Sequence, residues 1–303
     1  MSASFAKALE AAHDAAGSQN NPASTLYVVA TPIGNLADIS LRALHVLARV
    51  DAVACEDTRH TQQLLRAYGL DRPGSQLLAV HQHNEAQAAQ TVIDRLAQGE
   101  RVAYVSDAGT PAISDPGARL VAAVRQAGYR VLPLPGASSV TTALSASGMT
   151  GDNGFVFAGF LPSKSGERQQ AVQALAQESR AVVLLEAPHR IEALAQALSV
   201  LGERRITVGR ELTKQFEQIE TLTAHDLPVW LAEKADRQRG EFVLVLHNAP
   251  VAASTSEGLR VLQILLPELP LKTAVKLAAE LTGESKNELY EKALVLKNGG
   301  SPH

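Results

Sequence analysis

The feature that most constrains this chain is a regular alternation, beginning near residue 26, of short apolar runs with longer segments of helical periodicity. The short runs are rich in β-branched residues and too brief for helices, so each predicts a buried strand. Strands that alternate with helices are typical of the α/β class. In the first domain the strands are expected at 26–30, 52–55, 77–80, 102–106 and 131–134.

A second set of alternating elements follows the turn Pro133–Gly136 and a helix expected over 138–147. Its strands are expected at 155–159, 182–186, 206–210, 218–223 and 242–246. Asn248–Glu257 has almost no large apolar residues and is interpreted as a linker to three short helices. The expected organisation is a frayed helix or flexible tail at 1–24, α/β domains at 25–136 and 137–249, and a helical domain at 258–297.

Composition excludes several classes of protein. With 46% hydrophobic and 19% charged residues, the chain can bury a sizeable core and is not disordered. Its apolar runs are far shorter than the roughly 20 residues that span a bilayer, and its first residues do not resemble a signal peptide, so no membrane partner is expected. Cys55 is the only cysteine, which excludes internal disulfides and favours a cytoplasmic protein. The net charge of −3 means that any nucleic acid must bind a local patch.

Three loops rich in Gly, Pro, Ser, Thr and Asp follow strands of the first domain: Thr31–Asp38, Ser106–Gly117 and Leu134–Ser139. Ligands of open α/β sheets bind at the carboxyl ends of strands, so these loops form the candidate site. Asp115 is explained as a helix N-cap, because Pro116 would occupy the first helical position. No such capping role is evident for Asp107.

Charged residues also follow two strands of the second domain, in Glu186–Arg190 and Arg210–Lys214. Surface solvation would explain either stretch alone, but their shared position at strand ends favours a functional role. His81–Glu85 contains potential metal ligands, yet alternate residues leaving a strand point to opposite sides, so no metal is expected. The chain lacks the Walker A, G-x-S-x-G, H-E-x-x-H and C-x-x-C motifs, which argues against the commonest nucleotide hydrolases, serine hydrolases and metallohydrolases.

Several longer motifs carry a resemblance to a known family. They are LYVVATPIGNLAD (26–38), CEDTR (55–59), VSDAGTPAISDPG (105–117), PGASSVTTALSASG (135–148), GFLP (159–162), EAPHRI (186–191) and RELTKQF (210–216). These motifs resemble the ribosomal RNA small-subunit methyltransferase I family of the tetrapyrrole methylase superfamily. The resemblance implies 2′-O-methylation of a cytidine in the decoding region of 16S rRNA by direct in-line transfer from S-adenosylmethionine. It also implies a cytoplasmic homodimer that acts on the small ribosomal subunit.

The resemblance further implies two successive α/β domains of the tetrapyrrole methylase type, with the cofactor in the cleft between them. The expected cofactor-binding residues are Pro32, Gly34, Ser106, Asp107, Thr110, Gly136, Ser138 and Ser139. One departure concerns the first loop, where tetrapyrrole methylases usually carry a Gly-x-Gly-x-Gly-Asp run and this chain has Ala30–Asn35. That departure favours the rRNA branch over a tetrapyrrole substrate.

A ribose hydroxyl needs a general base, or a cation that stabilises the developing oxyanion. The candidates are Glu56, Asp57, Glu186, His189, Glu211 and Lys214, and the sequence does not choose among them. The candidate RNA-binding residues are Arg59, Lys164, Arg190, Arg210 and Lys214. Ordinary surface ion pairs are the alternative for two of them: Arg190 with Glu186 or Glu192, and Lys214 with Glu211 or Glu217.

Two other functions stay open at this point. One is a methyltransferase of the same fold that acts on a tetrapyrrole or a protein side chain. The other is a catalytically silent ribosome-assembly factor that uses the terminal helices. The Ser106–Asp107 and Pro135–Gly136 loops argue against the silent factor, because such loops suit cofactor binding.

Overall fold

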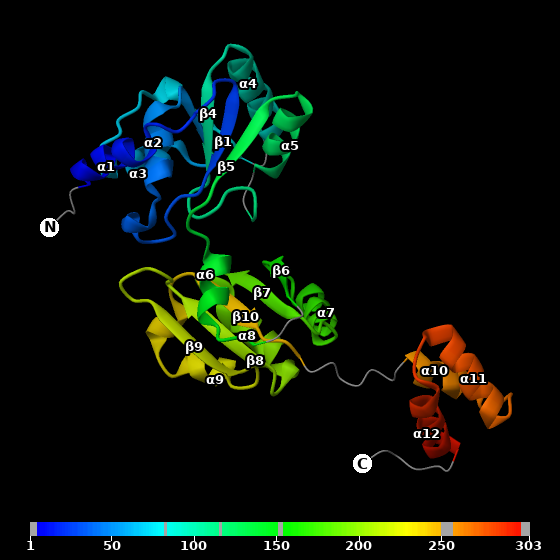
Figure 1. Ribbon diagram of the computed structural model, residues 1–303. Coiled ribbons are helices and arrows are strands. Elements are labelled where there is room, and N and C mark those ends of the chain that lie inside the picture. The colour runs from blue at the N-terminus through cyan, green and yellow to red at the C-terminus, as the bar shows by residue number, and fades with distance from the viewer. Residues whose placement is uncertain (1–4, 82–83, 115–116, 151–153, 250–256, 298–303) are drawn as a thin grey trace. The chain divides into compact units, whose positions relative to one another are not determined.

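The computed structural model describes residues 5–81, 84–114, 117–150, 154–249 and 257–297. The chain forms two compact units, one spanning residues 1–248 and the other residues 249–303. Two five-stranded sheets form the core of the larger unit (Figure 1). The first contains β1 (Thr25–Val29), β2 (Ala52–Cys55), β3 (Leu77–Ala79), β4 (Arg101–Val105) and β5 (Arg130–Leu134) in the order β3-β2-β4-β1-β5, all parallel.

Helices cover both faces of the first sheet: α2 (Leu41–Arg49), α3 (Thr58–Ala67), α4 (Glu85–Ala97) and α5 (Ala118–Gln126). Consecutive strand residues point to opposite faces, so Leu26 joins the apolar cluster that includes Val92 of α4 and Leu120 of α5. Its neighbour Tyr27 joins the cluster on the other face. Burial on both faces explains why these strands are continuous apolar runs.

The second sheet contains the five strands that the sequence predicts, but most of its pairs are antiparallel. Its strands are β6 (Phe155–Gly159), β7 (Ala181–Glu186), β8 (Arg205–Arg210), β9 (Gln218–Thr223) and β10 (Phe242–Leu246) in the order β6-β7-β10-β8-β9. Among them only the pair of β6 and β7 is parallel. Its helices are α6 (Ser139–Ala146), α7 (Ser165–Ala176), α8 (Ile191–Leu198) and α9 (Leu227–Ala232).

An apolar cluster joins the two sheets. It combines Ile33, from the loop after β1, with Val140 and Ala143 of α6 and with Val183, Leu212, Val243 and Val245 of the second sheet and the loop that follows β8. The first loop therefore packs directly on one face of the second sheet. This contact holds the carboxyl ends of the first sheet's strands against the second half of the unit.

Of the two expectations for the first residues, a frayed helix or a flexible tail, the structure has the helix, because residues 6–16 form α1 (Ala6–Ala16), which packs against α2 (Figure 1). Ala12 is buried in a cluster with Leu44 and Tyr68, and the Phe5 ring meets the Tyr68 ring edge-on at 5.2 Å between centroids. The segment is rich in alanine, so its apolar periodicity is faint in the sequence. The tertiary contact with the fully buried Tyr68 orders it.

The smaller unit consists of α10 (Glu257–Leu265), α11 (Leu271–Thr282) and α12 (Lys286–Lys297) around its own core. That core contains Leu262, Ala274, Val275, Ala278, Leu289 and Ala293. Gly283, at φ 72°, ends α11 in the left-handed conformation that glycine adopts without strain. Across the described ranges, the chain contains no helix with the length and apolar character needed to cross a bilayer.

His247, just after β10, makes the stability of the larger unit depend on pH. Its Nε2 lies 2.7 Å from Thr207 Oγ1, and the side chain is 8% exposed. Burial, and next the nearby Arg205 and Arg204, lower the pKa of His247 below its usual value. The unfolded chain therefore takes up a proton at about pH 6.5 that the folded chain resists.

We expect the free energy of unfolding to decline as the pH falls from 7 to 5, and to decline less in His247→Gln. The stabilisation by neutral His247 is complete above the unfolded pKa and is lost as the pH falls toward the folded pKa. Urea unfolding at pH 7, 6 and 5 measures the slope, with the exposed His225→Gln as the control. Equal slopes in wild type and His247→Gln would contradict the assignment.

Candidate functional site

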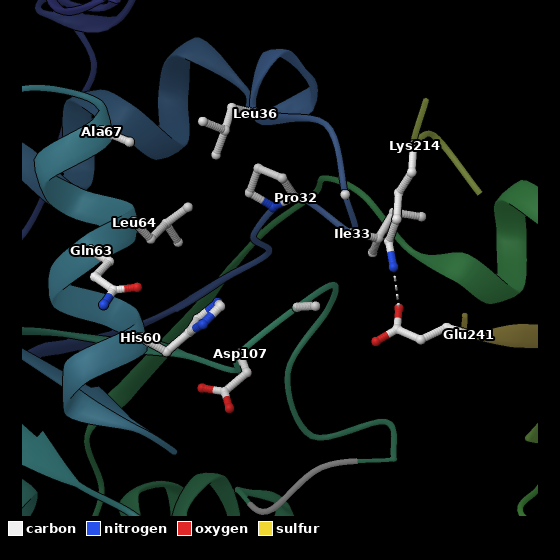
Figure 2. Close-up of a pocket in the computed structure, with 12 residues that line it drawn as sticks. Pro32, Ile33, Leu36, His60, Gln63, Leu64, Ala67, Asp107, Lys214 and Glu241 are labelled. Carbon is white, nitrogen blue, oxygen red and sulfur yellow. Dashed lines mark hydrogen bonds and ion pairs between the residues drawn. The ribbon is translucent and has the colours of Figure 1, made fainter. Parts of the chain in front are cut away.

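A cavity of about 480 Å³ lies between the strand ends of the first sheet and the loop after β8 (Figure 2). Its volume suits a small organic ligand. It is lined by Pro32, Ile33, Gly34, Leu36, His60, Gln63, Leu64, Ala67, Asp107, Ala108, Lys214 and Glu241. Pro32, Gly34, Asp107 and Lys214 are among the residues that the sequence predicts for the site.

Backbone hydrogen bonds join the first two glycine-containing loops behind this cavity. Thr31 and Gly109 exchange N–H to carbonyl bonds of 2.9 and 3.0 Å, and Thr31 Oγ1 donates to the Ser106 carbonyl at 3.2 Å. Ser106 is 1% exposed and its hydroxyl donates to the Ala108 carbonyl. The Ser106 side chain therefore supports the loop rather than facing the cavity.

Asp107 connects the second loop to α3. Its Oδ1 accepts a 3.2 Å hydrogen bond from the Asp57 N–H, so Asp107, for which the sequence shows no capping role, has a structural role through a distant residue. Asp57 in turn is the N-cap of α3, since Oδ1 accepts from the N–H groups of Arg59 and His60. The side-chain hydrogen bond with Arg59 contributes most to a pKa of Asp57 below its usual value, and the backbone N–H groups of Arg59 and His60 lower it as well. Asp57 is therefore a weak base at neutral pH.

One face of α3 supplies a wall that the sequence analysis missed. His60, Gln63, Leu64 and Ala67 line the cavity, and Figure 2 shows His60 and Gln63 beside Asp107. α3 begins at Thr58 because Asp57 caps it. The spacing of 60, 63, 64 and 67 is the helical signal that would have identified this face.

The opposite wall carries a partly exposed charge network. Lys214 Nζ lies 2.8 Å from Glu211 Oε1. It also lies 3.1 Å from Oε2 of the exposed Glu241 (Figure 2). Burial by itself lowers the Lys214 pKa, but the hydrogen bonds and charges of the two glutamates outweigh it and raise that pKa. Burial raises the Glu211 pKa. The hydrogen bonds from Lys214 and the Glu241 N–H, with the Lys214 charge, lower it by more, so the net shift is downward. Lys214 is therefore a fixed cation, and Glu211 is a poor proton acceptor.

The backbone around this network is unusually constrained. Glu211 and Thr213 have φ values of 51° and 66°, which β-carbon-bearing residues adopt at a cost. A side chain at Gly34 would overlap Cγ of Lys214, and one at Gly240 would overlap Glu211. Gly34 thus allows the loop after β8 to approach the loop after β1 closely, and Gly240 allows the same loop to pack against the segment before β10.

The remaining predicted cofactor residues hold the third loop. Thr110 Oγ1 donates to the Ala137 carbonyl at 3.0 Å, and a Cβ at Gly136 would lie 2.8 Å from Ala30 Cβ. Ser138 and Ser139 begin α6 and are half-buried. These four residues support the loops and do not line the cavity defined by the described residues.

The charged residues after β7 form a structural pair outside the cavity. The Glu186 side chain is 0% exposed, pairs with Arg190 Nε at 3.1 Å and accepts from the Ala187 N–H at 2.9 Å. Arg190 Nη2 also donates to the Leu161 carbonyl. The geometry favours the ion-pair interpretation of Arg190, while the neighbouring His189 is exposed.

The other predicted RNA-binding residues differ in accessibility. Arg210 is 8% exposed, and its guanidinium donates to the Arg239 and Phe216 carbonyls, so it holds the loop after β8. Arg59 and Lys164 have side chains 88% and 80% exposed, with partners in Asp57 and Glu167. Glu56 follows β2 and is half-buried.

Two sequence-based expectations, the helix N-cap at Asp115 and the potential metal ligands of 81–85, fall partly outside the described residues. Asp115, Pro116 and His83 lie outside the described residues. Within the described ranges, no group of three or more His, Cys, Asp or Glu side chains could hold a metal ion.

Comparisons with known proteins cover both units. The family model for Tetrapyrrole (Corrin/Porphyrin) Methylases matches residues 25–228, and that for the RsmI C-terminal HTH domain matches residues 252–297. Ribosomal RNA small subunit methyltransferase I of Vibrio cholerae is 50% identical over 276 residues, which cover 89% of this chain and 94% of that protein. The protein of the same name from Pseudomonas aeruginosa is 49% identical over 278 residues, which cover 90% and 97%.

Solved structures at low identity establish the fold. Uroporphyrin-III C-methyl transferase from Thermus thermophilus, complexed with S-adenyl homocysteine, is 17% identical with a TM-score of 0.51, covering 74% of this chain and 97% of that chain. Diphthine synthase is 14% identical with a TM-score of 0.55, covering 74% and 90%. The larger unit thus has the tetrapyrrole methylase fold, as the sequence predicts.

We expect Arg190→Ala to destabilise the larger unit by about 3 kcal/mol, because it leaves the buried Glu186 carboxylate without its charge partner. In a Glu186→Gln background the same substitution should cost much less. Urea unfolding at pH 7 tests both variants, and Arg59→Ala is the control, since an exposed pair contributes little. A loss for Arg190→Ala no larger than that for Arg59→Ala would contradict the structural role.

Proposed function

The chain belongs to the ribosomal RNA small subunit methyltransferase I family, and we propose on this premise that it methylates the ribose 2′-hydroxyl of a cytidine in the decoding region of 16S rRNA. The methyl donor is S-adenosylmethionine. The observation that carries the proposal is the extent of the similarity, which runs through both sheets and the terminal helices. The chain is proposed to work in the cytoplasm as a homodimer on assembled small ribosomal subunits.

The residues around the cavity fit this donor. Ile33, Leu36 and Leu64 offer apolar surface, Asp107 offers a carboxylate, and the loops after β1 and β4 offer backbone groups. Bound S-adenosylmethionine supplies an electrophilic methyl group on its sulfonium. Asp107, Pro32 and Gly34 would hold it directly. Ser106, Thr110, Gly136, Ser138 and Ser139 would shape the loops that carry the binding backbone.

The chain's own residues would act mainly by alignment and electrostatics. Aligning the hydroxyl with the methyl donor supplies a large part of the barrier reduction in a direct transfer. Lys214 remains protonated beside the cavity and would stabilise negative charge that develops on the ribose oxygen. Asp57 and Glu211 have lowered pKa values, which disfavours both as the base.

His60 is the proton acceptor that the geometry favours. It lies on α3, lines the cavity and lies next to Asp107, across the cavity from Lys214 (Figure 2). A neutral imidazole at this position would take the proton from the 2′-hydroxyl as the methyl group is transferred. Its neighbour Arg59, largely exposed, would contact an RNA phosphate, and Lys164 offers a second exposed cation in the other half of the unit.

The experiment that tests the function is methyl transfer from labelled S-adenosylmethionine to three acceptors in parallel. These are purified small ribosomal subunits, free 16S rRNA and a tetrapyrrole. Nuclease digestion and nucleoside analysis of labelled rRNA should identify 2′-O-methylcytidine. Label in the tetrapyrrole alone, or on a base rather than a ribose, would reject the proposal.

We expect Asp107→Asn and Asp107→Ala to weaken binding of S-adenosylmethionine by about 1.5–3 kcal/mol, as for a lost charge-assisted hydrogen bond. Asn keeps an oxygen that accepts from the Asp57 N–H, so only Ala should also lose fold stability. Calorimetry with and without a chelator measures binding. Asp51→Ala is the matched control, because Asp51 likewise accepts a backbone N–H, from Arg101, far from the cavity. Wild-type affinity in folded Asp107→Asn would refute this role.

We expect His60→Gln to slow methyl transfer about 100-fold without changing S-adenosylmethionine binding, since general base catalysis contributes effects of this size. His225→Gln, on the surface of the second half, should behave as wild type. A variant that keeps the wild-type rate would exclude His60 as the base.

A further inference from the structure

A second hollow of about 650 Å³ adjoins the cavity. The two share Gly34, Leu36 and Lys214 in their walls, so they lie next to each other. The other lining residues of the second hollow are Phe5, Asn35, Thr213 and Gln215. The wall of this hollow therefore includes the start of α1, a segment that precedes residue 25, where the family match begins.

Phe5 is held firmly at this position. Its ring meets Tyr68 at an interplanar angle of 67°, and the Tyr68 hydroxyl donates a 2.6 Å hydrogen bond to the Leu36 carbonyl. Tyr68 is fully buried, so one edge of Phe5 has rigid support, while the half-buried ring also borders the hollow. An aromatic ring supported in this way is a ready stacking surface.

The polar groups of the hollow suit a nucleic-acid base. Asn35 and Gln215 are exposed amides, and Asn35 uses its Oδ1 to accept from the Ala37 N–H, which leaves its NH₂ group to donate outward. Lys214 is the one cation among the described lining residues, and two glutamates already compensate it. Stacking and amide contacts without a free cation favour a base over a phosphate.

We propose that Phe5, Asn35 and Gln215 form a subsite for an unpaired base of the RNA, next to the nucleotide that enters the cavity. This inference rests on the proposed function, because the RNA must pass the shared wall at Gly34 and Lys214 to reach the cavity. The aromatic ring stacks on the base, and the two amides contact its edge. α1 thereby acts in substrate positioning.

The test uses Phe5→Leu, which keeps an apolar contact with Tyr68 but removes the aromatic face, and Phe5→Trp, which restores one. With small ribosomal subunits as substrate, Phe5→Leu should raise KM roughly tenfold, the size expected for loss of one base–aromatic stack. The kcat and the affinity for S-adenosylmethionine should stay within twofold of wild type. Phe5→Trp should return KM to near the wild-type value, and the matched control Phe155→Leu, on exposed strand β6, should leave it unchanged.

Two results would overturn the subsite. One is a KM for Phe5→Leu within twofold of wild type. The other is an equal loss in Phe5→Leu and Phe5→Trp that follows a lowered Tm, which would indicate only a packing role.

A binding measurement separates this proposal from the proposed function. A photoreactive benzoylphenylalanine at position 5 should cross-link to a 16S rRNA nucleotide next to the methylated one. Cross-links to ribosomal protein alone would overturn the subsite even if methylation proceeds. Failure of wild type to methylate rRNA would reject the function, whereas the cross-link reports RNA contact without turnover.

Discussion

The packing of Ile33 against the apolar face of the second sheet is the contact on which the site depends. Ile33 follows β1 and lies in one cluster with Val183 and Val243, so it connects the ends of the first sheet's strands to the second. The backbone bridge between Thr31 and Gly109 ties the neighbouring loop to the same contact. This apolar junction brings the loop that carries Asp107 and the loop that carries Lys214 to the same cavity.

Charged side chains on both sides of that junction are held in place by hydrogen bonds and ion pairs. Asp107 holds the start of α3 through the Asp57 N–H, and α3 presents His60 to the cavity. On the other side, two glutamates orient Lys214 against Gly34. The result is a cavity with one polar wall from each half, in which hydrogen bonds and ion pairs within the protein hold Asp107 and Lys214. Such preorganisation would suit the direct methyl transfer that we propose.

The structure also separates supporting residues from those that face the site. Ser106, Thr110 and Arg210 resemble ligand-binding residues in the sequence, yet each uses its polar group to hold a loop. The same is true of Arg190, which compensates the buried Glu186. A hydrogen-bonding side chain after a strand therefore indicates where a site lies, but it does not show that this side chain contacts the ligand. Loops need internal hydrogen bonds of their own, and many polar side chains serve that purpose.

The sequence by itself determined the two sets of five strands, the helices between them, the glycine-rich loops and the family, because apolar periodicity and turn residues are local signals. Only the tertiary structure decided the strand directions of the second sheet, the docking of α1, the contact of Asp107 with Asp57 and that of Lys214 with Glu241. It also placed His60 and Phe5 beside the site. These features depend on contacts between residues far apart in the chain, such as Asp107 with Asp57 and Phe5 with Tyr68, and no local pattern encodes which distant side chain completes a hydrogen bond or an apolar cluster.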